Sequence, residues 1–194
     1  MNQNRIPEIR RDIVAIGRLL WEKDLTAGRS GNISARVDEQ FFLITASQTC
    51  LGLLREYDIV CMDVNGACEN EDLQPSSEWR LHAAIYQQYP ECKSIVHVHA
   101  FHTNVFFLKN DQIEPKILEA KHVLGDVPVV MQSTMNVEDC EAVVKVLKEN
   151  QIVVLKNHGC LAMGKDLFEC FVLLQTLEEA AKTAIISTLY NQAV

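Results

Sequence analysis

Residues 75–105 contain the pattern that decides the fold of this chain, and they read PSSEWRLHAAIYQQYPECKSIVHVHAFHTNV. Apolar residues in the segment 77–89 recur with helical spacing, which predicts a helix. The segment 94–99, SIVHVH, is short, apolar and rich in β-branched residues, which predicts a strand. A helix followed closely by a strand favours an α/β domain, and 194 residues are enough to give one such domain a hydrophobic core.

Similar patterns precede this segment. Apolar residues three and four positions apart after Pro7 predict a helix with proline in its first turn. The turn-forming stretch GRSGNIS at 28–34 follows that helix. Two short apolar segments, 41–45 and 58–64, then have the composition of strands.

The C-terminal half continues the alternation of strands and helices. Asn136 is placed to cap a helix that runs through Leu147, and Asp166 with Glu169 forms a capping box for a final helix from 167 to about 190. No linker interrupts the chain, so residues 1–194 are predicted to form one domain with a central sheet between helices. The pattern leaves open whether the sheet is parallel or antiparallel. Further strands are predicted at 128–131, 151–156 and 160–163.

Charge and cysteine content exclude several classes of protein. The formal net charge is −8 and no Lys/Arg cluster occurs, which argues against a nucleic-acid-binding protein. Seven cysteines without a CxxC motif predict reduced thiols in a reducing compartment. No apolar run is long enough for a signal peptide or a membrane span, so a cytoplasmic protein without a membrane partner is expected.

Three histidines form a candidate metal site. His97 and His99 are two residues apart at the end of a predicted strand, so both imidazoles project to the same face. His158 follows a second predicted strand, in the turn Asn157-His158-Gly159. An HxH pair alone is more often a pair of partly buried polar residues. Three histidines at the ends of two strands, however, match the three protein ligands of a catalytic zinc ion.

A carboxylate and two hydroxyls stand at the start of the helix in the central segment. Glu78 could simply complement the helix dipole there. Ser76 and Ser77 favour a functional interpretation, because hydroxyls and free N–H groups at a helix N-terminus can bind a phosphate. Arg29, in the glycine turn, is a further candidate for binding a phosphate or carboxylate, although a solvated surface position is an equally good interpretation.

Four segments together resemble the class II aldolases, the family of fuculose-phosphate aldolase and the adducin head domain. They are GRSGNIS (28–34), PSSEWRLHAAIYQ (75–87), IVHVHAFHTNV (95–105) and KNHG (156–159). The resemblance covers nearly the whole chain in the expected order, and 75–87 is especially similar to fuculose-phosphate aldolase. It implies a three-layer α/β/α sandwich with a mainly antiparallel sheet, assembled as a homotetramer whose active sites lie at subunit interfaces.

The resemblance also implies roles for individual residues. His97, His99 and His158 would bind one zinc ion per subunit, and Glu78 would be the catalytic acid/base that also ligates the metal when substrate is absent. The phosphate pocket would be formed by the residues Gly31, Asn32, Thr45, Ser47, Gln48, Ser76 and Ser77. The implied reaction is retro-aldol cleavage of a phosphorylated ketose, or a related sugar phosphate, through an enediolate.

Two departures from the family pattern keep alternatives open. The loop 45–48 reads TASQ where the family has Thr-Pro-Ser/Thr-Gly, so Gln48 replaces a glycine. The segment 114–125 has no tyrosine in the place of the proton donor that these aldolases supply from a neighbouring subunit. A sugar-phosphate dehydratase or decarboxylase is therefore an alternative. A non-catalytic adducin-like assembly module is another, although such modules lack the metal histidines that this chain retains.

Overall fold

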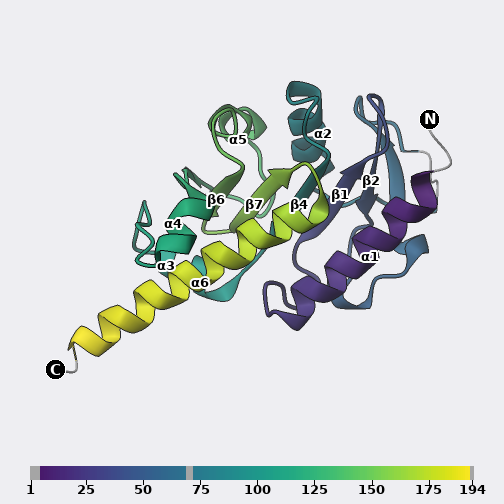
Figure 1. Ribbon diagram of the computed structural model, residues 1–194. Helices are drawn as coiled ribbons and strands as arrows, with labels where there is room; N and C mark the ends of the chain where they lie inside the picture. Colours follow the sequence, from purple (N-terminus) through teal and green to yellow (C-terminus); the bar gives the residue numbers. More distant parts are fainter. Residues whose placement is uncertain (1–4, 69–71, 193–194) are drawn as a thin grey trace.

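The computed structural model describes residues 5–68 and 72–192, and these form a sheet covered by helices on both faces (Figure 1). Within those ranges the sheet has seven strands in the order β3-β2-β1-β4-β7-β6-β5. Every neighbouring pair is antiparallel except β5 and β6, which are parallel. The mainly antiparallel three-layer architecture that the resemblance implied is thus confirmed. The strands are β1 Asn32–Arg36, β2 Phe41–Thr45, β3 Ile59–Asp63, β4 Ser94–Val98, β5 Val129–Met131, β6 Ile152–Lys156 and β7 Gly159–Gly164.

Two hydrophobic cores fill the space between the layers, because alternate residues of each strand point to opposite faces. One core lies under α1 (Ile6–Glu22) and α6 (Leu167–Gln192), with α3 (Phe101–Phe107) and α4 (Leu118–Leu124) beside them. The other lies under α2 (Trp79–Gln88) and α5 (Cys140–Val146). In β4, Val96 belongs to the first core and Ile95 to the second. His97 therefore points to the side of the sheet that carries α2.

Most predicted elements are present within a residue or two of their expected bounds, but one helix starts later than predicted. Asn136 does not cap it: α5 begins at Cys140, and its N-cap is Asp139, whose carboxylate accepts from the backbone N–H of Ala142. Asp166 does cap α6, with its side chain accepting from the backbone N–H of Glu169. Short 3₁₀ helices at Leu51–Leu53 and Glu56–Asp58 connect β2 to β3.

The short helices α3 and α4 were not predicted from sequence, and α3 shows why. Its N-cap, Ala100, has no side-chain cap. A residue far along the chain replaces the cap: Glu178, buried on α6, accepts from the backbone N–H groups of His102 and Thr103 at 2.9 and 2.8 Å. It also bonds the Nδ1 atom of His102 and the hydroxyl of Thr103, at 2.7 and 2.8 Å. The contact fixes α3, which starts two residues after His99, and gives His102 a structural role.

Replacing Glu178 by alanine is expected to destabilise the fold by about 2–4 kcal/mol, because it leaves the buried N–H and O–H donors of α3 without an acceptor. The measurement is urea unfolding followed by circular dichroism. The neighbouring Glu179, which is exposed on the same helix, provides the matched control. If Glu179→Ala lowers the free energy of unfolding as much as Glu178→Ala does, the Glu178 cap does not stabilise the fold to the predicted extent.

The described residues contain no helix that is both long and apolar enough to cross a membrane. The seven cysteines, all of which lie in the described part of the chain, are not joined by disulfide bonds. The long helix α6 extends beyond the body of the domain toward the C-terminus (Figure 1).

Candidate active site

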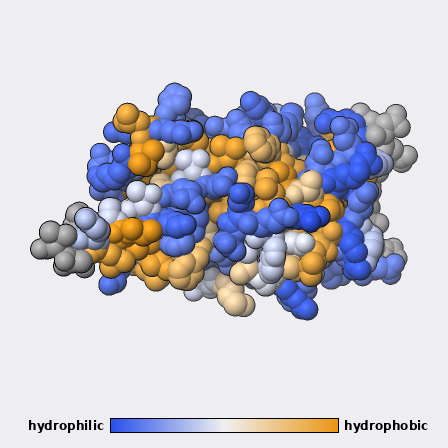
Figure 2. All heavy atoms as spheres, turned by 60° about the horizontal axis from the view of Figure 1, so that its bottom comes forward, coloured by the Kyte–Doolittle hydropathy of each residue, from blue (hydrophilic) through white to orange (hydrophobic). Residues whose placement is uncertain are grey.

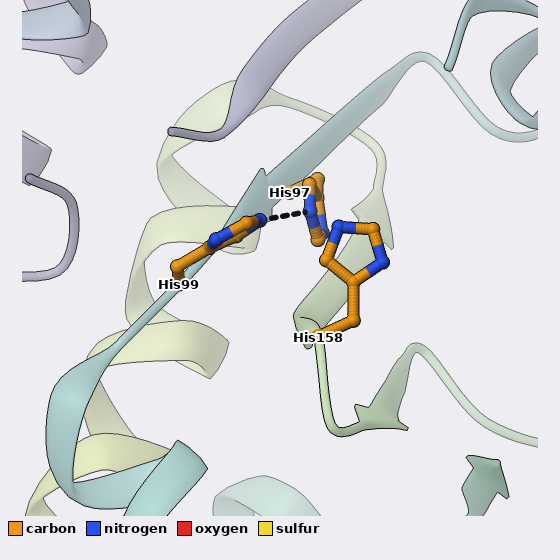
Figure 3. A group of neighbouring side chains, drawn as sticks. All are labelled: His97, His99 and His158. Carbon is orange, nitrogen blue, oxygen red and sulfur yellow. Dashed lines mark hydrogen bonds between the residues drawn. The ribbon is translucent and has the colours of Figure 1, made fainter. Parts of the chain in front are cut away.

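The three predicted metal ligands converge in the middle of the sheet, where β4 ends and β7 begins. His97 is the fourth residue of β4, His99 follows the end of that strand, and His158 lies in the turn between β6 and β7. Because β4 and β7 are adjacent and antiparallel, the end of β4 meets the start of β7. One ring nitrogen from each histidine lies within 4.8 Å of the others, and the three rings face one another (Figure 3). Three imidazole nitrogens this close together have the type and number of protein ligands that a catalytic zinc ion takes, so these residues could hold one.

The hydrogen bonds of His97 define which of its nitrogens can bind a metal. Its Nδ1 atom lies 3.0 Å from the carbonyl oxygen of Cys160. A carbonyl can only accept, so Nδ1 carries the proton and Nε2 keeps a free lone pair. Nε2 is also the atom that faces His99, 3.0 Å from the Nε2 of that residue. A backbone carbonyl that orients a histidine in this way is the usual support of a metal ligand.

Two glycines allow the strand ends to come this close. A Cβ atom on Gly159 would lie 2.3 Å from the carbonyl oxygen of Val98 and 2.9 Å from ring carbons of both His97 and His99. A Cβ atom on Gly31 would lie 2.6 Å from the carbonyl oxygen of His97, and Gly31 has a φ angle of 83°. Any larger residue at either position would push the strands apart. The glycines of the motifs GRSGNIS and KNHG thus have a geometric function at the site.

Glu78 lies beside the histidines, as the sequence interpretation required. It is the N-cap of α2, and 6% of its surface is exposed. Its Oε2 atom accepts from the side-chain amide of Asn32 at 2.9 Å and lies 3.4 Å from Nε2 of His97. Its Oε1 atom lies 3.7 Å from Nε2 of His158. Burial raises the pKa of this carboxyl, but His97, Asn32 and His158 outweigh burial and lower the pKa below its ordinary value. Glu78 is therefore ionised at neutral pH.

A cavity of about 830 Å³ opens above these residues. It brings together Glu78, the three histidines and six of the predicted phosphate-binding residues: Gly31, Asn32, Ser47, Gln48, Ser76 and Ser77. Thr45 is not part of the lining, because its buried hydroxyl accepts from the backbone N–H of Ile33.

The sequence analysis did not predict Gln132, which is buried directly after β5 and lines the same cavity. Its position directly after a short apolar strand is the signal that could have found it.

Arg29 and Gln48 meet at the mouth of the cavity. Nη1 of Arg29 donates to the side-chain oxygen of Gln48 at 3.2 Å, and both residues are exposed. Gln48 has a φ angle of 63°, the left-handed conformation that favours glycine, so the residue that replaces the family glycine keeps a glycine-like backbone. Arg29 is the one permanently charged cation among the cavity-lining residues that the structure describes.

The buried histidines should make the metal-free protein sensitive to mild acid. Burial lowers the pKa of His82, which lies one helical turn after Glu78, to about 3, from an ordinary value near 6.5. Burial, with help from His97 and His158, also lowers the pKa of His99 to about 3. At pH values between about 3 and 6.5, these two histidines bind protons in the unfolded chain but not in the folded chain. The free energy of unfolding therefore falls as the pH falls through this range.

From pH 7 to pH 5, His82 alone is expected to reduce the free energy of unfolding of the metal-free protein by about 2 kcal/mol. Glu78 does not contribute in this range, because its ordinary and lowered pKa values both lie below pH 5. Urea unfolding of metal-free protein at the two pH values is the measurement. Equal stability at pH 5 and pH 7 would contradict the expected burial of neutral imidazoles.

Comparison with known proteins identifies relatives over almost the whole chain. Residues 11–185 match the family described as Class II Aldolase and Adducin N-terminal domain. The L-fuculose phosphate aldolase of Methanocaldococcus jannaschii is 29% identical over 184 residues, which cover 94% of this chain and 99% of that protein. The 3-oxo-tetronate 4-phosphate decarboxylase of Haemophilus influenzae is also 29% identical, over 94% of this chain and 88% of that protein.

Solved structures show the same fold. The crystal structure of L-fuculose-1-phosphate aldolase from Thermus thermophilus superposes with a TM-score of 0.87 and 26% sequence identity. The superposition covers 97% of this chain and 100% of that chain. The arrangement of layers and strands described above is therefore shared over the full length of that protein.

Proposed function

This chain belongs to the class II aldolase and adducin N-terminal domain family and is an aldolase-type lyase, and from that premise we propose that it cleaves a phosphorylated ketose or a related sugar phosphate with the help of one zinc ion. The observation that carries the proposal is the convergence of three imidazoles and one buried carboxylate at the base of a polar cavity. Each of the four groups alone has a structural explanation. Together they form the ligand set and the acid/base of one reaction centre.

His97, His99 and His158 would hold the zinc. Two observations on the donor set support this assignment. The lone pair of His97 Nε2 is directed away from its supporting carbonyl and toward His99. Oε1 of Glu78 and Nδ1 of His158 are buried without a hydrogen-bond partner among the described residues, which indicates that the polar groups here serve more than the fold. When bound, the zinc would supply Lewis-acid polarisation of a substrate carbonyl.

The chain's own residues would bind the substrate at its two ends. At one end, the hydroxyls of Ser76 and Ser77, the amide of Asn32 and the 47–48 backbone surround the part of the cavity proposed for the phosphate. Arg29 adds a positive charge at its mouth, which is important because the chain as a whole has a formal charge of −8. At the other end, Glu78, which is ionised in the free protein, would take up a proton from water and deliver it to the carbon from which the departing fragment separates.

Decarboxylation of a sugar-acid phosphate is a second candidate, and a specific observation favours it. Retro-aldol cleavage must remove a proton from the hydroxyl of the departing fragment, and the segment 114–125 has no tyrosine to take part in that step. Loss of carbon dioxide needs no such base, because a carboxylate is already ionised. The likeness to a 3-oxo-tetronate 4-phosphate decarboxylase, which equals the likeness to an aldolase in identity, agrees with this alternative.

We also propose that the chain assembles as a homotetramer in the cytoplasm. Ile186, Leu189 and Tyr190 are exposed on the part of α6 that extends beyond the body. Figure 2 shows apolar atoms gathered at that end of the molecule, next to its C-terminus. Burial of these side chains against other copies would remove apolar surface from water. Sedimentation equilibrium measures the assembly state directly.

The experiment that tests the proposed function is a product assay on zinc-loaded protein. Phosphorylated ketoses and 3-oxo sugar-acid phosphates are supplied in parallel, and released aldehyde and released carbon dioxide are measured separately. Aldehyde release supports the aldolase and carbon dioxide release supports the decarboxylase. If the protein binds no zinc and its stability does not change with added zinc, the adducin-like assembly module is the better description.

A further inference from the structure

Two tight turns meet at the mouth of the cavity, and each presents one long polar side chain. The first turn, 27–30, carries Arg29 and is closed by a hydrogen bond from the backbone N–H of Ser30 to the carbonyl oxygen of Ala27 at 3.1 Å. The hydroxyl of Thr26, a buried residue, donates to the carbonyl oxygen of Ser30 at 2.6 Å. The backbone around Arg29 is therefore held in place by hydrogen bonds within its own turn.

The second turn, 46–49, carries Gln48 and is tied to the segment that leads into α2. The hydroxyl of Thr49 donates to the first carbonyl oxygen of the turn at 2.8 Å. The backbone N–H of Ser47 donates to the carbonyl oxygen of Gln74, also at 2.8 Å. The turn is thus fixed beside the segment that carries the two candidate phosphate-binding serines.

Gln48 has a backbone conformation that glycine adopts more easily. Its φ angle is 63°, and a side chain at such an angle is disfavoured relative to glycine. Strain of this kind gathers at functional sites, where other interactions offset it. Among the described residues, the one hydrogen-bond partner of the Gln48 side chain is Nη1 of Arg29, at 3.2 Å. The contact with Arg29 is therefore what the glutamine adds to a position suited to glycine.

The chemistry of the two groups determines how they meet. A guanidinium has donors only, so Gln48 turns its amide oxygen toward Arg29. The amide is neutral, so the contact orients the guanidinium without cancelling its positive charge. A carboxylate in the same place would also orient the guanidinium, but the ion pair would leave less charge for an anionic ligand. Nε and Nη2 of Arg29 have no hydrogen-bond partner within the described ranges, so these donors are available to a ligand.

The donors around this pair belong to the end of the cavity proposed for the phosphate. Ser76 and Ser77 line it just before α2, and Asn32 lines it from β1. Arg29 is the one permanent cation in the described lining, and the chain has a formal charge of −8. The overall field therefore does not attract an anion, and anion binding depends on where this single guanidinium is held.

We propose that Gln48 is a positioning residue for Arg29, and that the two side chains together favour a substrate that ends in a phosphate. An arginine that moves freely loses rotamer entropy when it binds an anion. A guanidinium that Gln48 already holds has lost part of that entropy beforehand, so the anion binds more tightly. The proposal rests on the phosphate-binding end of the proposed function.

Inorganic phosphate is the probe, and isothermal titration calorimetry of the zinc-loaded protein measures its affinity without turnover. Gln48→Gly removes the side chain and suits the positive φ angle, so the melting temperature should stay within about 3 °C of the wild type. We expect the affinity for phosphate to fall about 3–10-fold. A side chain that merely obstructs the pocket predicts the opposite sign. An unchanged or raised affinity in Gln48→Gly overturns the proposal.

The double variant shows whether Gln48 acts through Arg29. Arg29→Gln alone should lower the affinity for phosphate about tenfold or more, because a charge-assisted contact is lost. Adding Gln48→Gly to it should change the affinity less than about twofold, since no guanidinium remains to be held. If Gln48→Gly weakens phosphate binding equally with and without Arg29, the positioning role is excluded.

Two further variants test the part that charge plays. Gln48→Glu still offers an acceptor to Arg29 but neutralises it, and its affinity for phosphate should fall at least as far as that of Gln48→Gly. Wild-type affinity in Gln48→Glu would contradict the argument from the neutral amide. Arg18→Gln is the matched control, because Arg18 is exposed, pairs with Glu22 at 2.9 Å and lies outside the cavity. It removes the same charge and should bind phosphate as the wild type does.

Kinetics supply a readout that a purely structural role would not change. Gln48→Gly should raise KM more than it lowers kcat, because the histidines and Glu78 are untouched. The calorimetry does not depend on turnover, so the two ideas fail separately. A protein that cleaves no sugar phosphate but shows the expected affinities contradicts the proposed reaction and supports the positioning role. An active enzyme whose phosphate affinity does not depend on Gln48 contradicts the positioning role alone.

Discussion

Replacing Glu78 by glutamine is expected to lower kcat by about 10²–10⁴-fold while one zinc ion per chain remains bound. Glutamine keeps the size of the side chain and can still accept from the amide of Asn32, so the cavity retains its shape. It cannot hold or release a proton at neutral pH, and the reaction loses its acid/base. The zinc remains because its three imidazole ligands are untouched.

The measurements are steady-state kinetics and metal analysis on the same protein sample. Glu91→Gln, which removes an exposed carboxylate just beyond α2, is the control and should match the wild type in both. Full activity in Glu78→Gln would remove Glu78 from the mechanism. Loss of zinc from this variant would mean that the carboxylate is an essential metal ligand, and its catalytic role would then have to be tested by other means.

Replacing His158 by alanine is expected to lower the affinity for zinc by at least about 100-fold, and kcat/KM should fall with it at limiting zinc. The histidine lies in the turn between β6 and β7 and is only partly buried, so its removal should disturb the fold less than removal of the buried His97. With two imidazoles left, the site no longer has the three protein ligands typical of a catalytic zinc ion.

Thermal unfolding with and without zinc reports the loss of the site independently of activity. Zinc should raise the melting temperature of the wild type, because a ligand that binds only the folded state stabilises it. The rise should be absent in His158→Ala and present in His122→Ala, which removes an exposed histidine outside the cavity. A zinc-dependent rise of equal size in His158→Ala would exclude His158 as a ligand.

The elements that lie near the site were predictable to different degrees. The helix that carries Glu78 and the strand that carries His97 follow from local spacing, since apolar residues repeat with the period of the element they form. The helix α3, which begins just after His99, was missed because Glu178, 75 residues away from Thr103, caps its N-terminus. Gln132 was missed for a related reason: the apolar residues before it mark the end of a strand, but only the order of strands in the sheet places that end at the cavity.

The amino-acid sequence by itself determined the types of the main elements, the presence of His97 and His99 on one side of a strand end, and the position of Glu78 at a helix start. These features depend on contacts within a few residues, which the local pattern records. Only the tertiary structure decided that His158 meets the pair, that Thr45 lies outside the cavity, and that Ser34 holds His82 from 48 residues away. Such contacts depend on the order and direction of strands in the sheet, and strand order is a property of the packed chain that no local period contains.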